Sequence, residues 1–357
     1  MILVTGGAGF IGSFVVEQLC DLGHEVRVLD RLHPGAHDDV PADLDPRADW
    51  QWGDCCDGSV VARAVDGVDA VCHQAAMVGL GVDFADAPGY VRDNDLGTAV
   101  LLAGLHDREF RGRLVIASSM VVYGEGRYRC PRDGEVRPMP RTRDDLDAGR
   151  WEPTCPICSR ALVAVAIDET APLEPRNVYA ATKLHQEHLS AAYGREHDAT
   201  VVALRYHNVY GPRMPRDTPY AGVASIFRSA LEAGRAPTVF EDGGQVRDFV
   251  HVTDVARANV AALTTPEPRA GAYNVASGER RSVLEMAQAI VAGYPRGGPA
   301  PMVVPRYRLG DVRHVFGATT AARDGLGFVA EVNFAAGMRE FATATLRHPA
   351  GVRVPYP

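Results

Sequence analysis

Lysine is nearly absent from this sequence: of 37 basic residues only Lys183 is a lysine, and arginine supplies the rest. Acidic residues outnumber basic ones, so the net charge is −8 at pH 7. This balance argues against the basic stripe that is typical of nucleic-acid binding. No apolar run approaches the ~20 residues needed to span a bilayer. No charged segment precedes an apolar one at the N-terminus, so no signal peptide is expected. We therefore expect a cytoplasmic protein that binds neither nucleic acid nor membrane.

Cysteine is scarce, and its count of seven is odd, which argues against the disulfide framework of a small secreted protein. Low-complexity tracts are missing, and a composition of 46% hydrophobic and 23% charged residues excludes a disordered or fibrous chain. A length of 357 residues suits about two domains of ~100–200 residues each. A globular protein with a sizeable core remains.

Short apolar runs alternate with helical patterns in the first half of the chain, which is the signature of parallel βαβ units. We expect an α/β fold with a doubly wound, Rossmann-like parallel sheet. Residues 1–205 would form a dinucleotide-binding domain, and residues 206–357 would form mainly a smaller substrate lobe with some segments returning to the first domain. Residues 125–176 look like an insertion that contains cysteines. The expected strands are 2–4, 25–29, 50–52, 70–73 and 114–117, with a helix over 14–22.

A glycine-rich turn follows the first expected strand, with Gly6, Gly9 and Gly12 spaced as in dinucleotide-binding loops. These glycines permit a tight turn, close approach of a pyrophosphate and close packing of helix on strand. Asp30 ends the next strand, where a carboxylate accepts hydrogen bonds from an adenosine ribose and repels a 2′-phosphate. The loop therefore predicts NAD rather than NADP, although Arg31 could soften that preference.

The single lysine lies four residues after Tyr179, so a phenol and an ammonium share one helix face. A nearby ammonium favours the phenolate and would bring a poor base closer to neutral pH. Arginine cannot replace the compact ammonium at such a position. Ser119 follows a strand and could bind a substrate oxygen at the carboxyl edge of the sheet. Taken alone, each of these residues is more often structural.

Together these motifs resemble a known family. The matching segments are Thr5–Gly12, His73–Ala76, Asn94–Thr98, Ser118–Gly124, Tyr179–Lys183, Leu204–Arg213, Arg247–Asp254 and Tyr273–Gly278. They are similar to the extended short-chain dehydrogenase/reductase family, in particular to its NAD-dependent nucleotide-sugar epimerases of the UDP-glucose 4-epimerase type. The resemblance covers nearly the whole chain apart from the insertion, and the order of the motifs makes it specific.

The resemblance implies a role for each matching residue. Tyr179 would be the acid and base, Lys183 would bind the nicotinamide ribose, and Ser119 would bind the reacting hydroxyl. Tightly bound NAD would be contacted by Gly6, Gly9, Phe10, Ile11, Gly12, Asp30, Asp54, Ala75, Asn94, Tyr206, Tyr179 and Lys183. The nucleoside-diphosphate sugar would be held by Ser119, Asn208, Arg247, Arg308 and Asp311. A homodimer is implied as well.

Several reactions share this scaffold, so the fold does not choose among them. Family members that eliminate water carry an Asp-Glu pair directly after the serine, and decarboxylases commonly carry a Glu there. Here Met120 and Val121 occupy those positions and can move no proton. We therefore expect C4 epimerisation, with an NAD(P)H-dependent 4-ketoreductase as the alternative. A 4,6-dehydratase or a non-catalytic NAD-binding scaffold is less well supported.

The insertion contains two turns that resemble zinc knuckles. Cys130 and Asp133 are spaced by two residues, as are Cys155 and Cys158, and such pairs can converge on one tetrahedral ion. The departure is Asp133, which stands where Cys or His would be expected. Free thiols in a loop are the alternative. We expect any zinc here to be structural, and the insertion to form a lid or a subunit contact near the sugar site.

Overall fold

The computed structural model describes residues 1–79, 83–216, 222–267, 269–295 and 297–347. A seven-stranded sheet lies at its centre, and every neighbouring pair of strands is parallel. The strand order confirms the predicted doubly wound sheet, because it reverses direction between β1 and β4. In spatial order the strands are β13 Gly271–Val275, β9 Thr200–Tyr206, β5 Arg113–Ser119, β4 Ala70–His73, β1 Ile2–Thr5, β2 Val26–Asp30 and β3 Asp49–Trp52.

The five strands expected from the sequence are all present, with small shifts at their ends. The first helix differs more, because it begins four residues before the expected Phe14. Gly9 adopts extended backbone angles as the N-cap, so the helix can begin at once with Phe10. The glycine turn is therefore shorter than expected, and it ends directly on a helix N-terminus.

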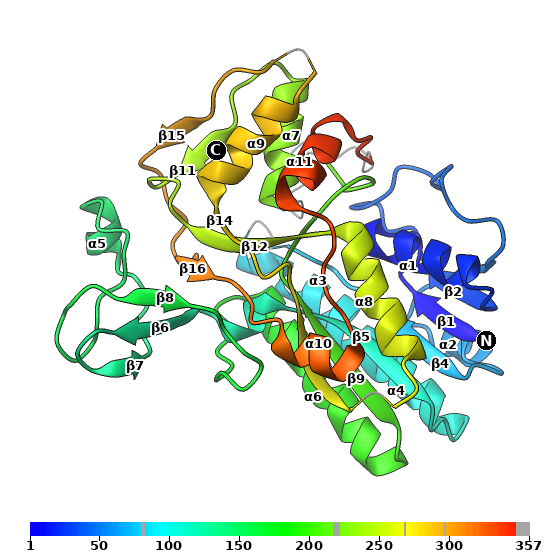
Figure 1. Ribbon diagram of the computed structural model, residues 1–357. Helices are drawn as coiled ribbons and strands as arrows, with labels where there is room; N and C mark the ends of the chain where they lie inside the picture. Colours follow the sequence, from blue (N-terminus) through cyan, green and yellow to red (C-terminus); the bar gives the residue numbers. More distant parts are fainter. Residues whose placement is uncertain (80–82, 217–221, 268, 296, 348–357) are drawn as a thin grey trace.

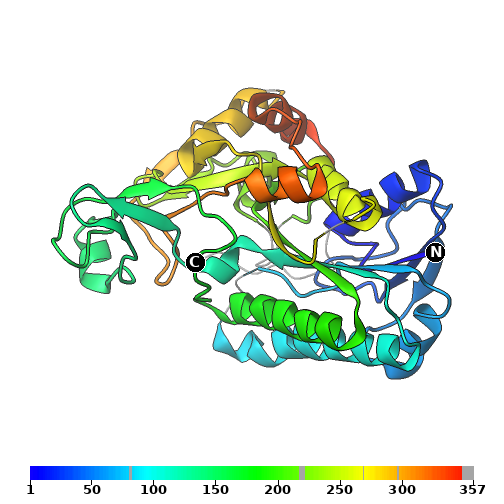
Figure 2. The same ribbon diagram turned by 60° about the horizontal axis from the view of Figure 1, so that its bottom comes forward.

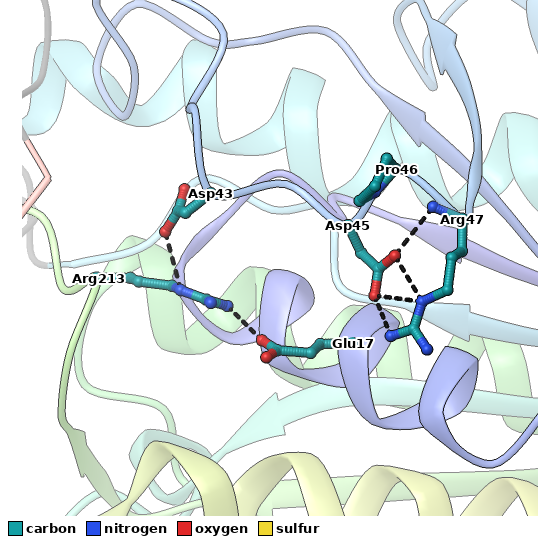
Figure 3. A pocket seen from close by; sticks show the side chains of 6 residues that line it. All are labelled: Glu17, Asp43, Asp45, Pro46, Arg47 and Arg213. Atoms are coloured by element: carbon teal, nitrogen blue, oxygen red, sulfur yellow. Dashed lines mark hydrogen bonds and ion pairs between the residues drawn. The ribbon is translucent and has the colours of Figure 1, made fainter.

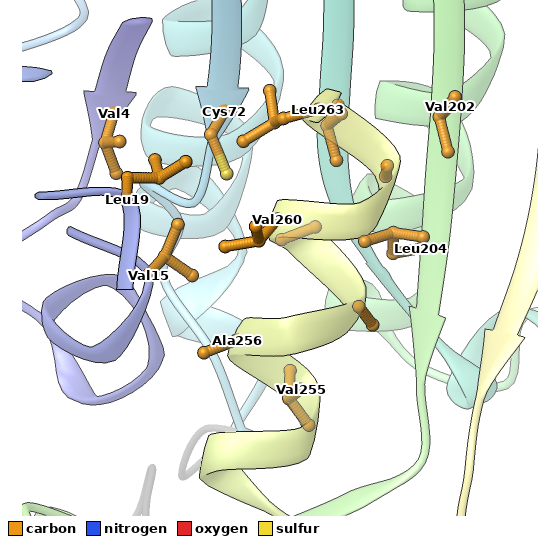
Figure 4. Packing of buried hydrophobic residues seen from close by; sticks show 14 of the residues in the cluster. Val4, Val15, Leu19, Cys72, Val202, Leu204, Val255, Ala256, Val260 and Leu263 are labelled. Carbon is orange, nitrogen blue, oxygen red and sulfur yellow. The ribbon is translucent and has the colours of Figure 1, made fainter. Parts of the chain in front are cut away.

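Helices cover both faces of the sheet, as Figure 2 shows. One face carries α1 Phe10–Asp21, α8 Val252–Thr264 and α10 Thr320–Leu326, and the other carries α2 Gly58–Ala64, α4 Gly97–Asp107 and α6 Val178–His197. Figure 4 shows α8 lying across the sheet, where Val255, Val260 and Leu263 pack among side chains of β1, β4 and β9. Each such buried side chain contributes ~1.5–3 kcal/mol of transfer free energy. Together, α8 and β13 bring residues beyond 206 back to this sheet.

The remaining C-terminal segments form a smaller lobe around its own apolar cluster, which includes Phe227, Met286 and Phe341. Its helices are α7 Val223–Glu232, α9 Val283–Gly293 and α11 Phe334–Thr343. Its strands are β10 Asn208–Tyr210, β11 Thr238–Phe240, β12 Val246–His251, β14 Arg280–Ser282, β15 Met302–Val304 and β16 His314–Val315. Val250 of β12 and the apolar residues of α8 belong to the cluster of the central sheet, whereas Phe249 of β12 belongs to that of the smaller lobe. The proposed division at residue 205 stays a prediction.

The insertion folds into a separate antiparallel sheet that projects from the molecule (Figure 1). Its strands are β6 Arg127–Cys130, β7 Gly134–Val136 and β8 Val163–Val165, with β6 in the middle. A short helix, α5 Arg143–Asp147, lies between β7 and β8. The insertion thus has regular structure and is not a plain loop.

Short helical segments complete the chain near the carboxyl edge of the central sheet. They are η1 Phe84–Asp86, α3 Ala87–Tyr90, the π-helix η2 Val91–Leu96, and η3 Met120–Tyr123. The π-helical segment places the side chain of Asn94 in the interior. None of the helices in the described part of the chain has both the length and the apolar character required to cross a membrane.

Candidate active site

The glycine turn lies where the sheet order reverses, between the carboxyl ends of β1 and β4. Gly6 has a φ of +69°, and a Cβ there would lie 2.6 Å from the Ala75 nitrogen. A Cβ on Gly12 would lie 2.2 Å from the Gly6 oxygen. Both positions therefore exclude any side chain. Doubly wound proteins bind their ligands at this reversal point.

The start of α1 fits the pyrophosphate of a dinucleotide. Gly9 caps the helix without a side chain, so the amides at Phe10 and Ile11 have no side-chain cap, and the first amides of a helix have no partner within it. Amides in this position bind phosphate oxygens. The buried Asp30 carboxylate accepts bonds from the amides of Ala8 at 3.0 Å and Leu32 at 2.8 Å. Its remaining lone pairs suit ribose hydroxyls, so the residues present fit NAD.

Arg31 is held by carboxylates beside this site. It pairs with Asp54 at 2.9 Å and with Asp93 at 2.5 Å, while Arg92 pairs with Asp54 at 2.7 Å. Although partial burial opposes it, the bonds from the Cys56 amide and these arginines hold the pKa of Asp54 well below its usual range. Arg31 is thus engaged in ion pairs, which reduces its capacity to attract a 2′-phosphate. This arrangement favours the NAD preference that Asp30 predicts.

A buried polar chain fixes the loop that follows β4. His73 contacts the hydroxyls of Thr5 at 2.7 Å and Thr98 at 2.9 Å, and burial lowers its pKa to about 3. Asn94 accepts from the Met77 amide at 2.7 Å and donates to Thr182 at 2.9 Å. The Asn94 side chain therefore ties the loop beyond Ala75 to helix α6. Its predicted contact with the cofactor stays a prediction.

Three predicted catalytic side chains meet at the end of β5. The Ser119 side chain lowers the pKa of the Tyr179 phenol and so favours its phenolate, and the nitrogen of Lys183 lies 5.9 Å from the centre of the Tyr179 ring. Lys183 is buried and donates to the Ala117 carbonyl at 2.7 Å, while burial lowers its pKa to about 7. Burial also raises the pKa of Tyr179 to about 12. This differs from the expected lowering, because desolvation of the phenol outweighs the opposing effect of the Ser119 side chain.

A further buried group behind Lys183 was missed by the sequence reasoning. Glu187 accepts from Ser118 and pairs with Arg205 at 2.8 Å. It lies one helical turn after Lys183, and Thr182 and Gln186 show the same spacing. The available signal was this run of polar residues on the buried face of α6. Such a face indicates a polar network where a helix packs on a sheet.

Tyr206 ends β9 directly opposite Ser119, as the register requires. Its hydroxyl contacts Gln74 at 2.9 Å and donates to Asn259 at 2.8 Å. Burial raises its pKa well above the usual range. The hydrogen bonds of Tyr206 therefore link β9 to α8 and to the residue that follows β4. Contact with the cofactor, predicted from the resemblance, is left as a prediction.

Apart from Ser119, the predicted substrate residues lie in the smaller lobe. The buried side-chain oxygen of Asn208 has no hydrogen-bond partner among the described residues, so its amide suits a polar ligand. Arg247 donates to the carbonyls of Val312 at 2.7 Å and Arg313 at 2.8 Å, and Asp311 lies 3.5 Å from it. Arg308 is exposed and lies over the ring of Phe240. Arg247 thus already supports the segment that carries the other two substrate candidates.

An open hollow of about 270 Å³ lies elsewhere, and none of the predicted site residues lines it (Figure 3). Arg213 bridges Asp43 at 2.8 Å and Glu17 at 2.9 Å, and Arg47 pairs with Asp45. The charges lining the hollow therefore satisfy one another. We place the active site at the carboxyl edge of the sheet, because the reactive groups converge there.

The four predicted metal ligands also come together. Ligand atoms of Cys130, Asp133, Cys155 and Cys158 all lie within 4.8 Å of one another. A carboxylate oxygen of Asp133 lies 3.3 Å from the Cys130 sulfur and 3.2 Å from the Cys155 sulfur. The sequence spacing therefore identified a real cluster that could hold a metal ion.

A doubly wound sheet, a side-chain-free helix start and the Ser119, Tyr179 and Lys183 arrangement define the class of extended short-chain dehydrogenases/reductases. More particularly, the chain belongs to the NAD dependent epimerase/dehydratase family, whose model matches residues 2–144 and 161–276. The matched segments omit residues 145–160, which contain Cys155 and Cys158. The family is thus established, and half of the cysteine cluster lies outside its pattern.

Individual relatives carry more than one activity in their names. A dTDP-L-rhamnose 4-epimerase of Burkholderia thailandensis is 32% identical over 347 residues, which cover 96% of this chain and 94% of the relative. A dTDP-glucose 4,6-dehydratase of Streptomyces niveus is 31% identical over 95% of this chain and 90% of its own length. The structure of a Thermus thermophilus UDP-glucose 4-epimerase in complex with NAD superposes with a TM-score of 0.75, at 31% identity and over 96% and 97% of the two chains.

Proposed function

We propose that this protein is an NAD-dependent epimerase that inverts C4 of a nucleoside-diphosphate sugar through a transient 4-keto intermediate. The observation that carries the proposal is the placement of Ser119, Tyr179 and Lys183 at the end of β5, without a further acidic group directly after the serine. Relatives named as 4-epimerases support the choice of reaction. The same relatives support a nucleoside-diphosphate sugar as the substrate.

The residues after Ser119 argue against loss of water. Met120 is buried and Val121 is partly buried, and neither side chain can transfer a proton. Elimination requires an acid and a base near C5 and C6 in addition to the group that acts at the 4-hydroxyl. Epimerisation requires only one acid and base, which Tyr179 supplies. This difference favours the epimerase over the dehydratase named among the relatives.

Tyr179 would take the proton of the sugar 4-hydroxyl and later return it to the 4-keto oxygen. NAD, when bound, supplies the acceptor and then the donor of the C4 hydride, so no reductant is consumed. Ser119 would hold the reacting oxygen through its hydroxyl, which also favours the phenolate of Tyr179. Because burial alone raises the pKa of the phenol, proton removal depends on positive charge nearby. The Lys183 ammonium and the oxidised nicotinamide would supply that charge.

Inversion requires the keto sugar to present its other face while the nucleotide stays bound. We assign the diphosphate to Asn208, Arg247 and Arg308, because an arginine fork can hold two phosphate oxygens at once. Asp311 would complete this end of the site. NAD would stay tightly bound through a full turnover, and the predicted zinc would be structural. A homodimer and a cytoplasmic location remain predictions.

The test is incubation of the purified protein with UDP-, dTDP-, GDP- and ADP-sugars without added reductant, followed by analysis of the sugars. Inversion at C4 without consumption of NADH supports the proposal. Stoichiometric use of NADH or NADPH on a 4-keto sugar would identify the ketoreductase instead. Formation of a 4-keto-6-deoxy sugar would identify the dehydratase. Retention of NAD with no conversion of any sugar would favour the non-catalytic scaffold.

A further inference from the structure

The part of the insertion that carries its three strands and its cysteines, residues 127–165, has no apolar core formed by several side chains. These residues are all described, and none of them belongs to the four buried hydrophobic clusters of the described chain, although Tyr128 and Leu146 are individually buried. Three strands of three or four residues cannot hold a fixed shape without such a core. Small folds of this kind are usually stapled by disulfides or by a metal ion. The cysteines here are free thiols, so a metal is the available staple.

The geometry of the cysteine cluster fits a tetrahedral ion. With zinc–sulfur bonds of about 2.3 Å and zinc–oxygen bonds of about 2.0 Å, neighbouring ligand atoms lie about 3.8 Å or about 3.5 Å apart. The sulfurs of Cys130 and Cys158 are 3.5 Å apart, and the Asp133 oxygen lies 3.2 Å and 3.3 Å from two sulfurs. Cys130 and Cys155 are buried, whereas Asp133 and Cys158 are partly exposed. Closed four-coordinate sites of this kind are structural.

Neighbouring groups hold these ligands in place. The second oxygen of Asp133 faces Arg132 at 3.6 Å, which leaves the first oxygen toward the sulfurs and offsets negative charge. The sulfur of Cys155 accepts the Ile157 amide at 3.4 Å, and the Cys155 amide donates to the Arg160 carbonyl at 2.8 Å. Partners that orient metal ligands in this way are a common feature of zinc sites. The turn is therefore shaped to present its two sulfurs to one point.

The same turn connects to the substrate lobe through Glu152, three residues before Cys155. One Glu152 oxygen accepts two bonds from Arg313, at 2.8 and 2.6 Å, and the other lies 2.8 Å from His314. The Arg313 side chain is only 2% exposed and also pairs with Glu241 and Asp242. A buried guanidinium needs these partners, because an unpaired charge in the interior is costly. Glu152 is the only insertion residue that the structure shows bonded to this side chain.

From Arg313 the contacts reach the predicted diphosphate site. Arg247 donates to the carbonyls of Val312 and Arg313, so the position of this backbone sets the position of its guanidinium. A second insertion residue, Arg141, donates to the Asp311 carbonyl at 2.8 Å and pairs with Glu241 at 2.8 Å. The insertion therefore bonds to both ends of the segment 311–314, through Arg141 at Asp311 and through Glu152 at Arg313 and His314. Its shape is transmitted to Arg247 through bonds that the structure shows.

We propose that Cys130, Asp133, Cys155 and Cys158 bind one structural zinc ion, and that the metal-held turn positions Glu152 to fix the 311–314 segment for nucleotide binding. The second part rests on the nucleotide-sugar function proposed above, whereas the first part stands without it. Glu152 is in this view a positioning residue. It acts on the nucleotide through Arg313 and Arg247 and has no part in the proton transfer by Tyr179.

The first test measures metal in the full-length protein, purified without chelators from zinc-supplemented cells. We expect about one zinc per chain in the wild type, less than a tenth of that in Cys158→Ser, and wild-type content in the control Cys56→Ser, whose thiol lies outside the insertion. Exchange of the wild type with cobalt should give thiolate charge-transfer bands and the visible bands of a tetrahedral ion. The cobalt spectrum requires no variant, so it remains decisive if Cys158→Ser does not fold.

The second test measures the binding of UDP and dTDP by calorimetry. Glu152→Gln should keep both zinc and NAD, yet weaken binding of the preferred nucleotide roughly tenfold. The control Glu135→Gln removes another insertion carboxylate, which pairs with Arg127 and not with Arg313. That variant should bind the nucleotide as the wild type does. A purely structural role for Glu152 would lower the melting temperature and leave the dissociation constant unchanged.

Each part can fail separately. A zinc-free wild type, a Cys130–Cys158 disulfide found by mass spectrometry, or full zinc content in Cys158→Ser would overturn the metal site. Unchanged nucleotide affinity in Glu152→Gln would overturn the positioning role and leave the metal site standing. A wild type that binds neither UDP nor dTDP would contradict the positioning role as stated. If the same protein also failed to convert GDP- and ADP-sugars, the proposed function would fail as well, with the zinc result unaffected.

Discussion

The central sheet and the cysteine insertion are stabilised by opposite means. In the sheet, side chains such as Val4, Val115 and Val202 are fully buried, and helices cover both faces. In the insertion, the fixed points are thiols, carboxylates and arginines. Apolar burial varies little with pH or salt, whereas charged contacts depend on both. The predicted catalytic residues therefore lie on the part of the molecule whose stability is less sensitive to pH and salt, whereas the proposed substrate end depends on the more sensitive part.

The largest effect is expected from Tyr179→Phe, which removes the proposed proton-transferring group. Turnover should fall by ~10⁴-fold, the upper end for loss of an acid–base group. NAD content should not change, because the glycine turn and Asp30 are untouched. Turnover is measured on the sugar identified in the panel, and bound NAD is measured after denaturation. Loss of NAD together with activity would mean that Tyr179 is needed to hold the cofactor, and would contradict a role limited to proton transfer.

Arg313→Met tests the charged region. The change leaves Glu241, whose side chain is 2% exposed, without one of its buried partners, and it breaks the bonds to Glu152. Breaking a buried ion pair costs ~3–5 kcal/mol in the free energy of unfolding. Urea denaturation measures this loss. In the exposed pair Arg323–Asp324, Arg323→Met should cost less than ~1 kcal/mol, and equal costs for the two variants would contradict the assigned role of burial.

Lys183→Arg preserves charge and tests whether a compact ammonium is required. Lys183 is 2% exposed, and its nitrogen lies 2.7 Å from the Ala117 carbonyl, so a larger planar guanidinium does not fit without displacing its neighbours. We expect turnover to fall ~100-fold, which corresponds to about 2.7 kcal/mol in the activation barrier. Arg195→Lys, on an exposed position of the same helix, is the matched control. Near-wild-type turnover in Lys183→Arg would show that only the charge matters.

The smallest predicted effect concerns the pH dependence of the sheet region through His73. Its pKa is lowered from 6.5 to about 3, so the unfolded chain binds more protons between these values. The contribution of His73 to stability is therefore intact at neutral pH and is lost as the pH falls from 6.5 toward 3. The loss between pH 7 and pH 5 should be about 2 kcal/mol. Urea denaturation of the wild type and His73→Gln at both pH values measures it, and identical pH dependence in the two proteins would contradict the assignment.

The sequence was a good guide wherever a signal was local. The glycine turn, Asp30 and the alternating apolar runs predicted the central sheet, because each βαβ unit repeats the same pattern within a short stretch. The spacing of Cys130, Asp133, Cys155 and Cys158 predicted their convergence, although Asp133 departs from the usual pattern. The family resemblance supplied the candidate roles of Tyr179, Lys183 and Ser119. Those roles still await experiment.

Contacts between distant segments were not predictable from the sequence. Nothing local to Glu152 or Arg141 indicates that they meet Arg313 and Asp311, about 160–170 residues further along the chain. The buried pair of Glu187 and Arg205 is only 18 residues apart, but the sequence does not show that these two side chains face each other across α6 and β9. In a chain so rich in arginine, each arginine is expected to be a surface charge unless the fold shows that it is buried among partners. The helix start at Phe10 was missed because extended backbone at Gly9 is not visible in residue types.

The fold class, the dinucleotide loop and the cysteine cluster could be predicted from the residues alone, because each depends on the order and spacing of nearby residues. The position of the one lysine, four residues after Tyr179, was evident in the same way. The burial of that lysine, and the dominance of desolvation in the pKa of the phenol beside it, became visible only in the folded chain. Only the tertiary structure joined the insertion to Arg247. Burial and long-range charge pairing depend on which distant segments pack together, and that is settled when the whole chain folds.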